Sequence, residues 1–389
     1  MEKSNSPHIR FKGFTEPWEQ RKYEEIFAYE RPDKYIVKSD KYVDDAHTPV
    51  LTANKAFILG YTEEINTYKN PCIIFDDFTL DNKLVNFDFM VKSSALKILT
   101  VKSGYDLIFS YSRLQSTKIE VLGHARHYIS VVQNTNVYCP NFNEQKLIGA
   151  LFNKLDSLIT LHQRKCDRLK KVKKGLLEKM FPTEKEDTPK IRFKGFTEPW
   201  EQRKLSSLIV DGGSGGTPLT SNQNYYNGTI PFLSITDISN SEGYIFDTEK
   251  HISKEGLRNS AAWIVPAESI SLAMYASVGK VAILKENTAT SQAFYNLVFD
   301  NLTTRNIIFQ ILKKKEINNE WISLISTGTQ ANLNAEKVRE AIISIPLSKE
   351  EQYKISGLLF KVDSLITLHQ RKCKKLKNIK SALLEKMFV

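Results

Sequence analysis

The sequence predicts an α+β protein in which two globular α/β modules are separated by two long antiparallel coiled-coil helices. Two duplications indicate this plan. The segment 9–22 returns without a change at 191–204, and the helical segment 154–166 returns at 361–373 with one substitution. The stretches between these repeats share almost no sequence. We therefore expect a pseudo-twofold internal repeat in which similar flanking segments enclose two different modules.

The length and composition are those of an ordinary soluble protein. A chain of 389 residues is long enough for two modules with a core each. It has no run of about twenty apolar residues and no signal-like N-terminus, so we expect a cytoplasmic protein without a membrane segment. Its four scattered cysteines indicate reduced thiols and no disulfide framework.

The net charge of +11 predicts a polyanionic partner, but the excess lies in two helical segments, 162–174 and 371–380. Solvated helix faces and direct phosphate contacts are both open explanations of these basic runs. The modules themselves are nearly neutral. A nucleic acid would therefore have to bind them through local basic faces.

The predicted elements follow one another as module, helix, linker, module and helix. The first module covers 1–143, and the first helix covers 144–181. A charged linker with a proline at each end covers 182–190. The second module covers 191–350, and the second helix covers 351–389.

Short β-rich runs predict strands in both modules. They lie at 71–75 and 128–132 in the first module, and at 230–238 and 276–284 in the second. The polar segment 327–334 predicts a loop that enters a helix.

Apolar residues recur at three-to-four spacing along both helices, which is typical of a coiled-coil seam. For a single copy, a helix packed on its own module would be favoured. Two matching seams favour antiparallel pairing of the two helices. The predicted pairing residues are Leu151, Leu155, Leu158, Leu169, Val172 and Leu176 in the first helix, and Leu358, Val362, Leu365, Leu376, Ile379 and Leu383 in the second.

Polar and aromatic residues gather in the predicted loops, in a mixture that suits base edges and phosphates. Asn, Gln and Arg can make paired contacts with bases, while Lys and Ser commonly hold phosphate. Turns and helix caps explain the same residue types. The candidate DNA-binding residues are Asn54, Lys55, Tyr61, Arg113, His124 and Arg126 in the first module, and Gly216, Thr217, Tyr275, Lys280, Gln330 and Asn332 in the second.

Two local patterns leave alternatives open. His124 and His127 could be two metal ligands, but no Cys or carboxylate lies at ligand spacing, so a structural or DNA-facing pair is favoured and no metal is expected. The glycine-rich segment 211–218 could cradle a phosphate, but it lacks the ending of a P-loop, and a flexible turn is favoured.

No assembled catalytic motif is visible. The chain contains no Pro-Pro pair, which the adenine-pocket box of amino-methyltransferases requires, and no zinc finger, HExxH or GxSxG motif. We therefore expect a binding and scaffolding subunit without catalytic residues, and not an enzyme.

The whole arrangement resembles the specificity subunit of type I restriction–modification systems. Glu144-Gln145 and Glu351-Gln352 open the two helices, and Leu-Leu-Glu-Lys-Met-Phe closes both. The resemblance covers essentially the whole chain. Segments similar to that family's target recognition domains are 48–55 and 57–62 in the first module, and 215–218, 230–233, 276–281 and 328–333 in the second.

The resemblance implies that each recognition domain reads one half of a split, asymmetric double-stranded DNA target, and that the helix pair sets the spacing. It implies no directly bound cofactor. Two modification subunits would dock on the helices and bring S-adenosylmethionine to methylate adenine at N6. Two restriction subunits could join them and add ATP- and Mg-dependent activity. A free-standing two-module DNA-binding regulator and a coiled-coil adaptor of two protein-binding domains are the alternatives.

Overall fold

The computed structural model describes residues 7–39, 41–43, 45–53, 56–119, 127–183, 186–321, 325–326 and 332–389. The chain divides into two compact units, of which the first comprises 1–163 with 371–389 and the second comprises 164–370. Each unit is thus assembled from both halves of the sequence. Among the described residues, no helix is both long enough and apolar enough to cross a membrane.

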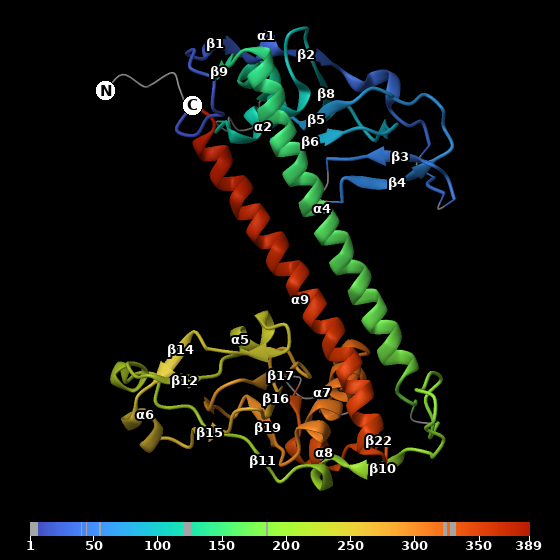
Figure 1. Ribbon diagram of the computed structural model, residues 1–389, viewed down its shortest axis with the longest axis vertical. Helices are drawn as coiled ribbons and strands as arrows, with labels where there is room; N and C mark the ends of the chain where they lie inside the picture. The colour runs from blue at the N-terminus through green and yellow to red at the C-terminus, as the bar shows by residue number, and fades with distance from the viewer. Residues whose placement is uncertain are drawn as a thin grey trace. The chain divides into compact units, whose positions relative to one another are not determined.

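In the first unit, short strands and helical turns lead into the long helix α4 (Figure 1). Strands β2, β8, β5 and β6 form an antiparallel sheet, β4, β3 and β7 form a second sheet, and β1 pairs with β9. The elements are β1 (Glu19–Lys22), α1 (Tyr23–Ile26), β2 (Phe27–Glu30), η1 (Pro32–Tyr35), β3 (Thr48–Leu51), β4 (Ile58–Thr62), β5 (Cys72–Asp76), β6 (Asn82–Val85), β7 (Met90–Val91), β8 (Leu96–Val101), α2 (Leu107–Ser116), α3 (His127–Ser130), η2 (Val132–Asn134), β9 (Asn136–Cys139) and α4 (Phe142–Lys179), which continues into the second unit.

Strand β5 lies where the apolar run 71–75 predicts a strand, and all of its residues are buried. Successive side chains of a strand point to opposite faces of the sheet. Ile73 and Phe75 therefore pack in a core with α2 and α4, whereas Cys72 and Ile74 pack in a core with β3 and β7. The central sheet is covered on both faces.

The core cysteines give a testable prediction. Burial raises the pKa of the Cys72 and Cys139 thiols to about 12. Because the thiolate is the reactive form, neither thiol should react with iodoacetamide at neutral pH in the folded protein, and both should react in denaturant. Mass spectrometry of the alkylated peptides measures this. Rapid alkylation of native Cys72 would contradict the packing of β5.

The second unit contains two larger sheets (Figure 1). Their strand orders are β11-β19-β16-β17-β13 and β14-β12-β18-β15, and β10 pairs with β22. The elements are β10 (Glu201–Lys204), η3 (Leu205–Leu208), β11 (Asp211–Gly213), η4 (Gln223–Tyr226), β12 (Ile230–Phe232), α5 (Ile235–Asn240), β13 (Tyr244–Ile245), β14 (Lys250–Ile252), α6 (Lys254–Arg258), β15 (Trp263–Val265), β16 (Ile270–Ala273), β17 (Val281–Leu284), β18 (Thr288–Thr290), β19 (Phe294–Val298), α7 (Leu302–Ile317), β20 (Ile325–Ser326), β21 (Asn332–Leu333), α8 (Ala335–Glu340), β22 (Ile342–Ile345) and α9 (Lys349–Lys386), which continues into the first unit.

One strand prediction is wrong and two are correct only in part, because a tertiary contact and a helix cap outweigh β propensity. The run 128–132 forms helical turns, in which the Tyr128 backbone N–H donates to the Asp77 carboxylate at 2.9 Å. The run 230–238 is a strand only as far as Phe232. A capping box between Ser234 and Asp237 then starts α5. The third run, 276–284, is a strand only in its second half, as β17.

The long helices pair antiparallel within each unit. In the first unit, the rings of Phe152 and Phe388 stack at 5.8 Å, and Lys380 Nζ donates to Asp156 Oδ1 at 2.7 Å. In the second unit, Cys166 of α4 forms a buried cluster with Val362 and Ile366 of α9. Residues later in α4 therefore contact residues earlier in α9, as expected for an antiparallel pair.

The seam differs in part from the predicted one. Val172, Leu365 and Ile379 are 44%, 45% and 39% exposed, so the prediction that they pair is wrong. Lys173 and Lys380 take the inward positions beside Val172 and Ile379, because their stems pack and their ammonium groups find carboxylates. Among the other predicted positions, Leu155 and Val362 are buried, and Leu151, Leu158, Leu169, Leu176, Leu358, Leu376 and Leu383 are half-buried.

The repeat duplicates this ion pair. Lys173 Nζ lies 2.6 Å from Asp363 Oδ1 in the second unit, as Lys380 does from Asp156 in the first. We expect Asp363→Lys to lower the free energy of unfolding of the second unit by about 2 kcal/mol, less than for a fully buried pair because both side chains keep some exposure. Adding Lys173→Asp should restore most of the loss. Urea titrations of both variants measure this, and a double variant no more stable than Asp363→Lys would contradict it.

Candidate nucleic-acid interface

Equivalent hydrogen bonds connect the duplicated segments 9–22 and 191–204 to the long helices α4 and α9. Arg10 donates from Nε and Nη2 to the two carboxylate oxygens of Glu144, both at 2.8 Å. Arg192 makes the same pair of bonds to Glu351, at 2.6 and 2.9 Å. These hydrogen bonds raise the pKa of both arginines. In each domain, the duplicated segment at its start, 9–22 or 191–204, which we call the entry segment, is thus bound to the first turn of the helix that follows the domain.

Several predicted contact residues fall outside the described part of the chain. They are Asn54, Lys55, His124, Arg126 and Gln330, together with the side chain of Asn332, whose backbone forms part of β21. In the first unit this leaves Tyr61, which lies on β4 and is 40% exposed, and Arg113.

Arg113 is not available to DNA, so its prediction as a contact is wrong. It is 6% exposed on α2, and its guanidinium lies over the ring of Phe388 at 5.5 Å. Its Nη1 donates to Ser116 Oγ at 3.0 Å and its Nη2 to the Val389 carbonyl at 2.6 Å. A basic residue next to Tyr and Ser reads as a loop contact in the sequence, but here it holds the end of α9.

His127 is a structural residue. It is 1% exposed, and its Nδ1 lies 2.6 Å from the Asp77 carbonyl oxygen, which can only accept, so Nδ1 carries the proton. The Asp77 carboxylate in turn lies 3.3 Å from Lys97 Nζ. His127 therefore does not face solvent. Within the described ranges, no group of three or more His, Cys, Asp or Glu could hold a metal ion.

In the second unit, Tyr275 is 41% exposed on the turn between β16 and β17. Lys280 is tied down at the other end of this turn, since its Nζ donates to the Ser239 carbonyl at 2.9 Å. Thr217 is exposed and donates from Oγ1 to Gln292 Oε1 at 2.9 Å. Thr217 also lines a cavity, together with residues that lie between Thr220 and His251.

The glycine-rich segment is not a flexible turn. Asp211–Gly213 is strand β11, and the following glycines pack closely on other backbone. A Cβ on Gly215 would lie 1.9 Å from the Thr290 carbonyl oxygen, and one on Gly216 would lie 2.7 Å from Ala261 Cβ. Only glycine fits, so Gly216 has a packing role, and its contact with DNA stays a prediction.

Gly215→Ala is therefore expected to lower the free energy of unfolding of the second unit by about 1–3 kcal/mol through overpacking. Gly213→Ala is the matched control, because its added Cβ would meet only Trp263 at an ordinary 3.8 Å. Thermal unfolding of both variants measures the difference. Equal losses would show that backbone freedom, and not the close approach, explains the glycines.

The cavity beside Thr217 holds a cluster that sequence reasoning missed. It measures about 790 Å³ and combines amide, hydroxyl and charged side chains with two aromatic rings. The signal in the sequence is the amide- and tyrosine-rich run 221–228, which resembles an ordinary turn until the fold brings β14 next to it. The lining residues are Thr217, Thr220, Gln223, Asn224, Tyr226, Asn227, Gly228, Phe232, Glu249, Lys250 and His251.

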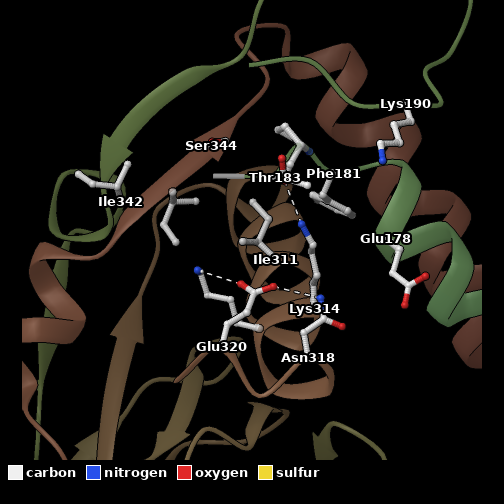
Figure 2. A pocket seen from close by; sticks show the side chains of 13 residues that line it. Glu178, Phe181, Thr183, Lys190, Ile311, Lys314, Asn318, Glu320, Ile342 and Ser344 are labelled. Carbon is white, nitrogen blue, oxygen red and sulfur yellow. Dashed lines mark hydrogen bonds and ion pairs between the residues drawn. The ribbon is translucent and has the colours of Figure 1, made fainter. Parts of the chain in front are cut away.

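A second cavity of about 610 Å³ lies at the end of α4, between α7 and β22. Figure 2 shows Lys314, Asn318 and Glu320 taking part in hydrogen bonds among the residues that line it. Lys314 Nζ donates to the Pro182 carbonyl at 2.9 Å, and Lys315 and Asn318 both donate to Glu320. Burial opposes ionisation of Glu320, but these hydrogen bonds lower its pKa overall. Pro182 is the repeat equivalent of Val389. Lys314 therefore binds the chain just after α4, as Arg113 binds the chain just after α9 in the first unit.

Comparisons with known proteins agree with this architecture. A family model described as type I restriction modification DNA specificity domain matches residues 197–378. The chain is 28% identical over 358 residues to the type I restriction enzyme EcoR124I/EcoR124II specificity subunit of Escherichia coli, covering 88% of this chain and 85% of that relative. It is 30% identical over 192 residues to the MjaIX specificity subunit of Methanocaldococcus jannaschii, covering 49% of this chain and 44% of that relative.

The fold is similar to the crystal structure of a type I restriction–modification S subunit from M. genitalium. The TM-score is 0.71 with 15% sequence identity, and the match covers 99% of each chain.

Proposed function

We propose that the chain is a specificity subunit of a type I restriction–modification system, as its likeness to such subunits supports. Its recognition domains, 1–143 and 191–350, would each read one half of a split, asymmetric DNA target. The observation that carries this proposal is that equivalent contacts anchor two unlike domains. The Arg10–Glu144 contact recurs as Arg192–Glu351, whereas the strand orders between the anchors differ. One frame with two different surfaces suits two different half-sites.

The helix faces support docking of two modification subunits. Leu161 and Leu368 occupy equivalent positions and are both 45% exposed, and Val172 and Ile379 form a second equivalent pair at 44% and 39%. Apolar side chains left exposed at repeated positions offer two like surfaces. One modification subunit would bind each, and restriction subunits would join through them.

In this proposal the chain contributes binding energy and no catalytic group. S-adenosylmethionine would be held by the modification subunits, and ATP with Mg²⁺ by the restriction subunits. The complex would act in the cytoplasm, on the cell's own DNA, and place adenine N6-methylation at one sequence by differential binding.

Methylation mapping tests the proposal. The chain is co-expressed with its modification subunit in a methylation-free host, and N6-methyladenine is located by single-molecule sequencing. The expected result is a split, non-palindromic motif with one methylated adenine in each half. Exchange of residues 23–143 for the corresponding segment of another specificity subunit should then change one half only.

The alternatives give different results. A free-standing regulator would bind its site tightly without modification subunits, and an adaptor would show no salt-dependent affinity for DNA. Absence of any motif, from an assembled complex supplied with S-adenosylmethionine, would overturn the proposal.

A further inference from the structure

We infer that the cavity between η4 and β14 reads base edges in the half-site bound by the second recognition domain, and that its side-chain amides select adenine. The inference rests on the function proposed above and names the residues that give it specificity. All residues that line the cavity, 217–251, belong to the second unit.

The walls of the cavity are held rigidly. The rings of Tyr226 and Phe232 meet edge to face with centroids 6.4 Å apart, and Tyr226 Oη donates to the Pro218 carbonyl at 2.7 Å. The chain passes so close to β14 at Gly228 that a Cβ there would lie 2.1 Å from the Ile252 carbonyl oxygen. Packing therefore fixes the part of the backbone that carries the lining side chains.

Three amide side chains at this cavity have no hydrogen-bonding task inside the protein. Gln223, Asn224 and Asn227 are exposed, and none of their side chains has a hydrogen-bond partner among the residues that the structure describes. An Asn or Gln amide can donate to N7 and accept from N6 of adenine at once. The three amides therefore offer the paired contacts that identify adenine.

Structural use explains other amides of this unit but not these three. Asn222, Asn301 and Asn334 cap η4, α7 and α8 by accepting from backbone N–H groups. Asn296 is buried and bonds to Thr290 and to the Gly213 carbonyl. Capping and core satisfaction are the ordinary reasons for Asn, and neither applies to the side chains of Gln223, Asn224 and Asn227.

The charged residues at the cavity complete a DNA-reading set. Lys250 is exposed, and within the described ranges its ammonium has no carboxylate within ion-pair distance, so it is free to hold a phosphate. Glu249 is exposed beside it and can only accept, which suits the amino group of cytosine. His251 is occupied, since its Nε2 lies 3.1 Å from Asp247 Oδ1.

The lining chemistry does not favour a small-molecule ligand. Such sites are mostly apolar with a few convergent polar groups. Here the reverse holds, because only Tyr226 and Phe232 are large apolar residues and most polar groups are exposed. An open polar surface with unused paired donors and acceptors matches base edges in a groove.

The test changes the amides one at a time and together. Gln223→Ala, Asn224→Ala, Asn227→Ala and the triple variant are each co-expressed with the modification subunit, and their methylation motifs are mapped. The triple variant should lose its preference for adenine, by about ten-fold or more, at one or more positions of one half-site. The other half-site should not change. Asn240→Ala, an exposed amide of the same domain outside the cavity, is the control and should leave the motif intact.

Outcomes for the two proposals are distinguishable. If the wild-type complex gives no split motif, the proposed function fails. If the wild type gives a split motif and the triple variant, folded and assembled, gives the same motif with the same fidelity, only the role of the cavity is overturned.

Lys250→Ala provides an independent readout. Loss of one phosphate contact should weaken DNA binding by the assembled complex equally for all sequences, and should reduce the slope of log K against log salt by about 0.9. The motif itself should not change. An unchanged salt slope would remove Lys250 from the interface.

Discussion

Replacing Phe388 with alanine is expected to lower the free energy of unfolding of the first unit by about 3–5 kcal/mol. Phe388 is 7% exposed at the end of α9. Its ring lies 6.2 Å from Trp18, 5.7 Å from Phe109 and 5.8 Å from Phe152, measured between centroids. One side chain thus joins the entry segment, α2, α4 and α9. The cavity left by its removal cannot collapse easily, because four elements would have to move together.

The repeat provides a matched variant for the second unit. Phe181 is the equivalent of Phe388, and its ring lies 5.7 Å from Trp200, the equivalent of Trp18. Hydrogen exchange of β5 and β16 separates the two effects. Phe388→Ala should accelerate exchange in β5, and Phe181→Ala should accelerate exchange in β16. Acceleration of both strands by either variant would show that the units unfold as one, which would contradict the division of the core.

The entry segments and the two long helices could be predicted from the sequence because each of them occurs twice. Duplicated residues are expected to make similar contacts in both copies. Trp18 and Trp200 are both core residues, and Glu144 and Glu351 both form an ion pair with an arginine. The position of the helices follows from the same argument. No comparable redundancy exists inside the domains, where each strand is predicted from one short run.

The seam shows why periodicity alone chooses wrong neighbours. Counting apolar residues selects Val172, but the inward position belongs to Lys173, whose charge is compensated by Asp363 on the other helix. Such compensation depends on a residue almost two hundred positions away and has no local signature. The same limit hid the amide cluster, since β12 must pair with β14 before Lys250 lies near Asn224.

The second large effect is expected at the ion pair between Arg10 and Glu144, which we call the entry clasp. Arg10→Ala should lower the free energy of unfolding of the first unit by about 3 kcal/mol, because it leaves the Glu144 carboxylate buried and unpaired. Glu144 has no exposed side-chain surface, whereas Arg10 keeps 13%. The positive end of the α4 dipole compensates part of the lost partner, so the loss should lie at the lower end of the range for broken buried pairs.

Pairing, and not the mere presence of Arg10, is tested by the double variant Arg10→Met/Glu144→Met. It removes the buried charge together with its partner and should be more stable than Arg10→Ala. Arg192→Ala is the counterpart in the second unit, where Glu351 is 1% exposed. Chemical denaturation followed by tryptophan fluorescence measures all three, since Trp18 and Trp200 lie beside the clasps in sequence. A double variant less stable than Arg10→Ala would mean that the clasp contributes through geometry, by orienting the entry segment on its helix, more than by neutralising a buried carboxylate.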